Sequence, residues 1–205
     1  MKLILIHGQG RTPLAMRLLG WRLKRRGHEV YYFGYISFIE RFIGIVDRFV
    51  RMIQQTVGAE PYTIVSHSLG GLIARAALPH LQKNLPQHLI MLAPPNQPSR
   101  MAKRAQRHSL YAWVAGECGQ KLADNAFYKS LPRPTILTTI IAGVGGPQGK
   151  LSPLGLEEND WVLSVAETRL GQGERLLTVN AAHALIMHSR EVARLILDSL
   201  AAEAT

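Results

Sequence analysis

The chain has 205 residues, a length that fits one ordinary domain and leaves little room for two. Hydrophobic residues make up 47% of it, which supports a large core and excludes a disordered or fibrous chain. The 24 lysines and arginines outnumber the 14 acidic residues, and the net charge of +10 favours anionic partners. A single cysteine, Cys118, excludes an intrachain disulfide, and no apolar run approaches the ~20 residues of a membrane span or forms a secretory signal. We therefore expect one cytoplasmic domain over residues 1–205.

Short apolar segments alternate with longer amphipathic segments from the first residue onward. A strand at 2–7 ends at Gly8, and a helix at 12–26 follows, with Pro13 in its first turn and Gly27 at its stop. The later elements, in order, are a strand at 29–33, a helix at 38–57, a strand at 62–66, a helix at 69–78, strands at 88–92, 135–142 and 175–179, and a helix at 184–202. This alternation predicts an α/β fold with a doubly wound, mostly parallel sheet of about six strands.

Two irregular segments interrupt the alternation, at residues 94–134 and 143–158. Long irregular connections in compact domains are commonly lids or binding loops, so we expect both to form the rim of a site. The chain has no room for a large cap domain.

Residues 62–71 have the pattern of a strand, a tight turn and a helix, with Ser68 at the turn. In a nucleophile elbow the serine is at the apex, and small residues two before and two after it let the strand and helix approach. Ser66 and Gly70 occupy those positions, with His67 beside the serine and Gly71 next in the chain. The pattern predicts that Ser68 is a nucleophile, although Ser66 stands where glycine is usual.

Acyl transfer at such a serine requires donors that stabilise a developing oxyanion. The backbone N–H of Leu69, directly after Ser68, is one candidate. The loop after the first strand supplies the other, because Gly8 lets the chain after His7 turn the N–H of Gln9 inward.

A serine nucleophile also needs a base and an orienting carboxylate, which in this fold class follow in the order serine, acid, histidine. His183 lies between the last strand and the last helix and is the predicted base. Asp160 follows the strand at 135–142 and is the predicted acid, with Glu157 and Glu158 close enough to substitute for it.

These segments resemble the α/β-hydrolase superfamily, and within it the bacterial triacylglycerol lipase and esterase-like group. Ile4-Leu-Ile-His-Gly8 is similar to the family's oxyanion strand, and Ser66-His-Ser-Leu-Gly-Gly71 to its G-H-S-x-G-G elbow. Asn159-Asp160 is similar to the family's N-D-G-x-V-S-V acid motif, with Trp161 in place of glycine. Further similar segments are Met91-Leu-Ala-Pro-Pro-Asn-Gln97, Gly116-Glu-Cys-Gly-Gln120 and Asn180-Ala-Ala-His183.

The resemblance implies a serine hydrolase that cleaves a carboxylic ester, with Ser68 as nucleophile, Asp160 as acid and His183 as base. It implies no cofactor and no metal, because the calcium ligands of the secreted relatives have no visible counterpart. An acyltransferase, a thioesterase or an amidase would use the same three residues. A non-catalytic scaffold of this fold is the remaining alternative.

The basic residues form two groups with two interpretations each. The first group lies on the first helix and consists of Arg11, Arg17, Arg22, Lys24, Arg25 and Arg26. The second group follows the fourth strand, on a helix capped by Ser99, and consists of Arg100, Lys103, Arg104 and Arg107. Both groups are either solvated helix faces or weak docking sites for an anionic membrane surface. Nucleic acid is not expected as a partner, because no recognition motif is present and few aromatic residues accompany the charges.

Overall fold

The protein is described by a computed structural model over residues 1–106, 115–150 and 152–202. Six parallel strands form one sheet in the order β2-β1-β3-β4-β5-β6. The strands are β1 (Lys2–Ile6), β2 (Glu29–Phe33), β3 (Tyr62–His67), β4 (His88–Leu92), β5 (Leu137–Gly143) and β6 (Glu174–Val179). The predicted α/β fold class is therefore confirmed.

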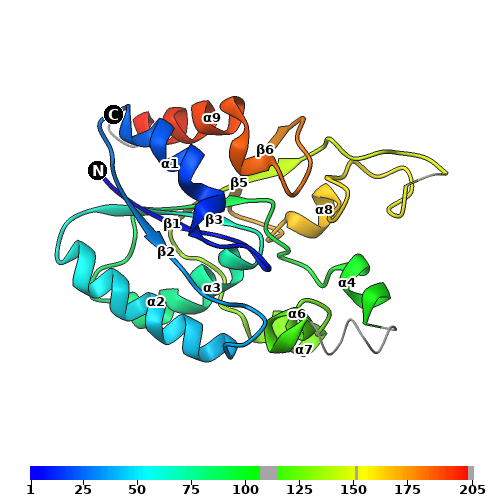
Figure 1. The fold of residues 1–205 in the computed structure, drawn as a ribbon, viewed down its shortest axis with the longest axis horizontal. Helices are drawn as coiled ribbons and strands as arrows, with labels where there is room; N and C mark the ends of the chain where they lie inside the picture. The colour runs from blue at the N-terminus through cyan, green and yellow to red at the C-terminus, as the bar shows by residue number, and fades with distance from the viewer. Residues whose placement is uncertain (107–114, 151, 203–205) are drawn as a thin grey trace.

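Helices cover both faces of this sheet (Figure 1). One face carries η1 (Pro13–Met16), α1 (Arg17–Lys24) and α9 (Arg190–Ala201), and the other carries α2 (Phe42–Val57) and α3 (Leu69–Ala77). Strand β1 shows why two layers form, because Leu3 and Leu5 pack on the first side and Ile4 and Ile6 on the second. The buried side chains of β1 thus alternate between two separate hydrophobic cores, one on each face of the sheet.

Two helices begin later than the sequence pattern predicts. Helix α2 starts at Phe42 instead of residue 38, because residues 37–39 form a separate turn closed by hydrogen bonds to Ile36. The Ser37 hydroxyl accepts a hydrogen bond from the amide of Gly10, and the Glu40 carboxylate accepts one from Ile36. The final helix is divided into η3 (Ile186–His188) and α9, because the Ser189 hydroxyl caps α9.

The described parts of the segment 94–134 contain short helices at the carboxyl end of the sheet: α4 (Arg100–Ala105), α6 (Gly116–Lys121) and α7 (Asn125–Ser130). Ser99 caps α4 as predicted, accepting a hydrogen bond from the amide of Ala102. Residues 107–114, including Arg107 of the predicted basic face, and residue 151 lie outside the described residues. Two further short helices among the described residues are η2 (Leu78–Leu81) and α8 (Val165–Thr168).

The strand order creates a switch point between β1 and β3. The chain leaves β1 toward α1 on one face and leaves β3 toward α3 on the other, so a crevice opens where these neighbouring strands end. Gly8 follows β1 and Ser68 follows β3, so both lie at this crevice. In the part of the chain that the structure describes, no helix is long and apolar enough to cross a bilayer.

Candidate active site

Ser68 lies at a sharp turn between β3 and α3, with backbone angles of φ 50° and ψ −123°. This left-handed conformation costs a non-glycine residue ~1–2 kcal/mol, and hydrogen bonds on both sides of the turn hold it. The amide of Ser68 donates to the carbonyl of Leu92 at 2.9 Å, and its carbonyl accepts from the amide of Gly71 at 2.8 Å. The turn is the strained elbow that the sequence pattern predicts.

Small residues are required around this turn because other backbone and side-chain atoms fill the space. A Cβ on Gly70 would lie 2.6 Å from the carbonyl oxygen of His7, and one on Gly71 would lie 2.6 Å from Met91 Cε. Ser66 is fully buried, and its hydroxyl lies 3.4 Å from the carbonyl of Ile90. The elbow thus accommodates serine where the family pattern has glycine.

The structure brings Ser68, His183 and Asp160 together, although they are far apart in the chain. His183 Nε2 lies 3.0 Å from Ser68 Oγ, and His183 Nδ1 lies 2.7 Å from Asp160 Oδ2. The other carboxylate oxygen of Asp160 accepts hydrogen bonds from the amides of Val162 at 3.0 Å and Leu163 at 2.7 Å. Because a carboxylate only accepts hydrogen bonds, Nδ1 carries the proton in neutral His183 and Nε2 is free to accept one from Ser68.

His7 orients the peptide that follows β1. Its Nδ1 lies 2.8 Å from the Gly8 carbonyl, and its Nε2 accepts a hydrogen bond from the amide of Tyr35 at 3.3 Å. Burial lowers the pKa of His7 and keeps the ring neutral in this arrangement. Because C=O and N–H point in opposite directions across a trans peptide, the N–H of Gln9 is turned away from His7.

Gly8 itself lies against the serine, since a Cβ there would be 2.9 Å from Ser68 Cβ and 2.8 Å from His67 Nδ1. The second predicted oxyanion donor, Leu69, is the first residue of α3, so its amide N–H has no acceptor within the helix. The two predicted donors therefore come from the loop after β1 and from the first residue of α3, which meet at Ser68.

His67 contributes a contact that sequence analysis did not predict. Its side chain is buried, and its Nε2 lies 3.1 Å from the carbonyl oxygen of His183. Burial, and then the neighbouring His183, holds the pKa of His67 well below 6.5, so the neutral ring donates this hydrogen bond. The residue before the serine thus anchors the loop that carries His183.

A cavity of about 230 Å³ opens onto Ser68 and His183. Its walls are mainly apolar and come from the start of the 94–134 segment, α4, the end of α6 and the loop after Asp160: Pro95, Ser99, Met101, Ala102, Ala105, Leu122, Val162 and Leu163. Sequence analysis did not identify the apolar residues of α4 as a cavity wall. Over residues 1–106, 115–150 and 152–202, no three His, Cys, Asp or Glu side chains are grouped so that they could hold a metal ion.

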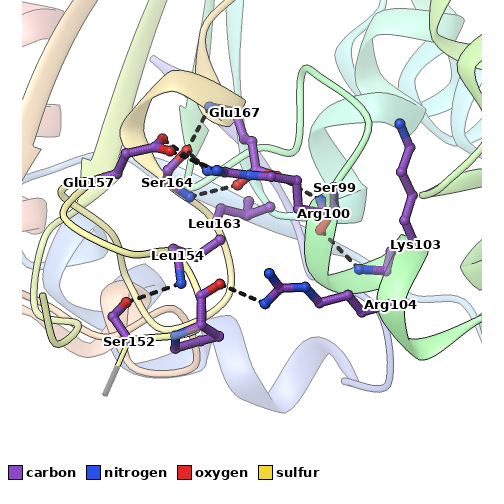
Figure 2. Close-up of polar contacts among 12 residues, drawn as sticks. Ser99, Arg100, Lys103, Arg104, Ser152, Leu154, Glu157, Leu163, Ser164 and Glu167 are labelled. Carbon is purple, nitrogen blue, oxygen red and sulfur yellow. Dashed lines mark hydrogen bonds and ion pairs between the residues drawn. The ribbon is translucent and has the colours of Figure 1, made fainter. Parts of the chain in front are cut away.

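Two of the basic residues of α4, Arg100 and Arg104, are bonded to neighbouring loops (Figure 2), and Lys103 donates to the Asn125 side chain of α7 at 3.1 Å. Arg100 donates to both carboxylate oxygens of Glu157, at 2.6 and 2.9 Å, and also contacts Glu167 and Ser164. Arg104 donates to the carbonyl of Pro153 at 2.6 Å. Glu157, one of the two substitutes considered for Asp160, is thus paired with Arg100, and Arg100 joins the cavity wall to the loop that carries Asp160.

Trp161 occupies a backbone position that favours glycine. Its φ is 82°, and its amide donates to the Asn159 side chain at 3.0 Å, while its indole N–H donates to the Gly145 carbonyl at 3.1 Å. These bonds hold the turn that presents Asp160, although the side chain at this position is large.

No protein-family model matches the sequence, and no curated protein matches it at a significant level. Solved structures do match. The mature lipase BlEst2 of Bacillus licheniformis aligns with a TM-score of 0.78 and 17% identity over 97% of this chain and 91% of the lipase. The phospholipase PlaB of Legionella pneumophila gives a TM-score of 0.63 and 19% identity over 82% of this chain and 46% of PlaB. A thioesterase domain from the curacin biosynthetic pathway gives a TM-score of 0.62 and 14% identity over 96% of this chain and 90% of that domain. The chain therefore has the α/β-hydrolase fold.

Proposed function

We propose that the protein is a serine hydrolase that cleaves carboxylic esters through an acyl-enzyme on Ser68. The observation that carries this proposal is the continuous hydrogen-bonded arrangement from Ser68 through His183 to Asp160, at the apex of a strained elbow. A structural serine would not require a left-handed turn at the mouth of a cavity.

In the proposed reaction, Ser68 Oγ attacks the ester carbonyl carbon while His183 Nε2 takes the hydroxyl proton. Asp160 stabilises the resulting imidazolium, and the amides of Gln9 and Leu69 donate to the oxyanion. Collapse breaks the bond to the alcohol oxygen, which leaves with the proton from His183. Water then attacks the acyl-serine with the same base, and the acid product and Ser68 are released.

The cavity wall supports an uncharged acyl group as the substrate class. Met101, Ala102 and Leu163 place apolar atoms around Ser68, whereas the cationic groups of Arg100 and Arg104 are directed to Glu157, Glu167 and Pro153. We infer a short apolar acyl chain, because the described cavity is small for a hydrolase substrate.

The test combines covalent labelling with turnover. A fluorophosphonate should modify Ser68, identified by peptide mass, and p-nitrophenyl esters from acetate to dodecanoate should show a preference for short chains. Ser68→Ala should abolish labelling and lower kcat by about 10⁴-fold or more, whereas Ser130→Ala, which removes an exposed serine of α7, should change neither. Labelling at another serine, or faster turnover of acyl thioesters or amides than of esters, would contradict the proposal.

A further inference from the structure

An exposed stripe of apolar residues runs along η1 and α1. Leu14 is 66% exposed, Leu18 is 42% exposed and Trp21 is 52% exposed. Their spacing of four and three residues places them on one side of the helix, opposite Leu19 and Leu23, which are buried against the sheet. A tryptophan and two leucines in a row on the surface are the kind of patch that marks an interaction site.

Cations surround this stripe. Arg17, Lys24 and Arg25 are exposed on the same side of α1, and the Arg25 guanidinium lies 5.0 Å from the centre of the Trp21 ring. Beside them, a groove of about 740 Å³ runs between α1 and α9, and four more arginines contribute to its lining: Arg22, Arg26, Arg190 and Arg194. The two helices come from opposite ends of the chain and lie together on one face of the sheet (Figure 1).

The positive charge of this surface is largely uncompensated within the protein. The acidic residues on α9, Glu191 and Asp198, both contact Arg194. Among the described residues, no carboxylate lies within ion-pair distance of the other six cations, namely Arg17, Arg22, Lys24, Arg25, Arg26 and Arg190. The surface therefore presents a positive field around an apolar centre.

We propose that the α1–α9 surface, defined as the apolar stripe together with these seven cations, docks the protein on an anionic phospholipid bilayer. Tryptophan and leucine insert at the boundary between headgroups and acyl chains, and arginine and lysine remain at the level of the lipid phosphates. A nucleic acid would satisfy the cations but would leave Leu14 and Leu18 facing charged phosphates. The combination of apolar and basic residues thus favours a membrane.

This surface is connected to the candidate active site through η3. His188 Nε2 lies 3.2 Å from the Ala15 carbonyl, and Arg22 donates to the His188 carbonyl at 2.6 Å. Leu185 is exposed and is only two residues from His183. Docking through α1 would therefore hold the loop that carries His183 in a defined orientation to the bilayer.

The test is binding of the full chain to vesicles of phosphatidylcholine, with and without phosphatidylserine. The wild type should bind only the vesicles that contain phosphatidylserine, and binding should weaken as salt is added. Arg25→Glu with Arg26→Glu should weaken binding at least about 30-fold, which corresponds to ~2 kcal/mol at ~1 kcal/mol per cation. The matched control, Arg51→Glu with Lys129→Glu, changes the net charge equally away from this surface and should bind like the wild type.

A second variant separates the membrane from other anions. Leu18→Ser with Trp21→Ser keeps every cation and should also weaken vesicle binding, while thermal unfolding shows that the chain is folded. Turnover of a soluble short-chain ester should be unchanged in all variants, because none of these residues lines the cavity at Ser68. Absence of vesicle binding by the wild type, equal weakening in the control, or binding to duplex DNA that the serine variant retains in full would overturn the proposal.

Discussion

The imidazole of His67 donates a hydrogen bond to the backbone carbonyl of His183, across a Nε2–O distance of 3.1 Å. The two rings lie 5.1 Å apart, and His67 is in the same strand-to-turn segment as Ser68. The contact therefore couples the serine to the loop that carries its base. His67 acts on position, because its own ring does not contact the serine hydroxyl.

The stability of the protein should fall as the pH is lowered below 6.5. Burial lowers the pKa of both His67 and His7 in the folded protein, so the unfolded chain binds more protons below 6.5. Each histidine then contributes a loss of up to about 1.4 kcal/mol per pH unit, until the pH reaches its lowered native pKa. Urea unfolding at pH 7.5, 6.5 and 5.5 measures this slope. His67→Gln keeps a hydrogen-bond donor and removes one titrating group, so its free energy of unfolding should fall less steeply with decreasing pH. A slope equal to that of the wild type would contradict the lowered pKa of His67.

Asp160→Asn should lower kcat by roughly 10⁴-fold, because an amide cannot stabilise the imidazolium of His183 or hold its tautomer. Glu158→Gln is the matched control, since the Glu158 side chain is exposed on the same loop, while the backbone carbonyl of this residue accepts a hydrogen bond from the amide of Val165. Its activity should equal that of the wild type. The measurement is steady-state hydrolysis of a short p-nitrophenyl ester, and comparable losses in the two variants would exclude Asp160 as the acid.

Gly8→Ala should reduce activity strongly, because the added methyl group would lie 2.9 Å from Ser68 Cβ and 2.8 Å from His67 Nδ1. Either the serine or the loop that carries Gln9 must move, and small displacements at a reacting centre cost about 10²-fold in rate. Gly44→Ala adds the same group within α2, where the structure has open space, and should stabilise the fold by up to about 1 kcal/mol. Fluorophosphonate labelling rates and thermal unfolding of both variants test these two expectations. Full activity of Gly8→Ala would show that the close contact of Gly8 with Ser68 and His67 is not required for catalysis.

Arg100→Met should destabilise the protein by about 2–3 kcal/mol, because it leaves the buried carboxylate of Glu167 without its cation. Glu157→Gln should cost about 1 kcal/mol or less, because that partner is solvent-exposed. Arg104→Met, on the same helix, loses only a bond to the Pro153 carbonyl and serves as the control. Urea unfolding gives the stabilities, and equal effects of the two arginine substitutions would contradict the role given to Arg100.

Local patterns in the sequence predicted the succession of strands along the chain and the three residues Ser68, Asp160 and His183, but not the contact of His67 or the cavity wall. A strand followed by a tight turn and a helix is recognisable within ten residues around Ser68, and parallel strands bring their carboxyl ends to one edge. That topology explains why residues as distant as Ser68, Asp160 and His183 were expected together, and the structure places them within hydrogen-bonding distance.

Other features depend on contacts between distant segments, which no local pattern contains. The turn before helix α2 is held by a hydrogen bond from Gly10 to Ser37, and Arg100 is paired with Glu157. Likewise, the α1–α9 surface exists only because the first and last helices pack on the same face of the sheet. The hydrophobic period of a helix predicts which of its sides is buried. The partners of its polar side chains depend on the tertiary fold, because hydrogen bonds and ion pairs form only with the groups that packing brings within about 3 Å.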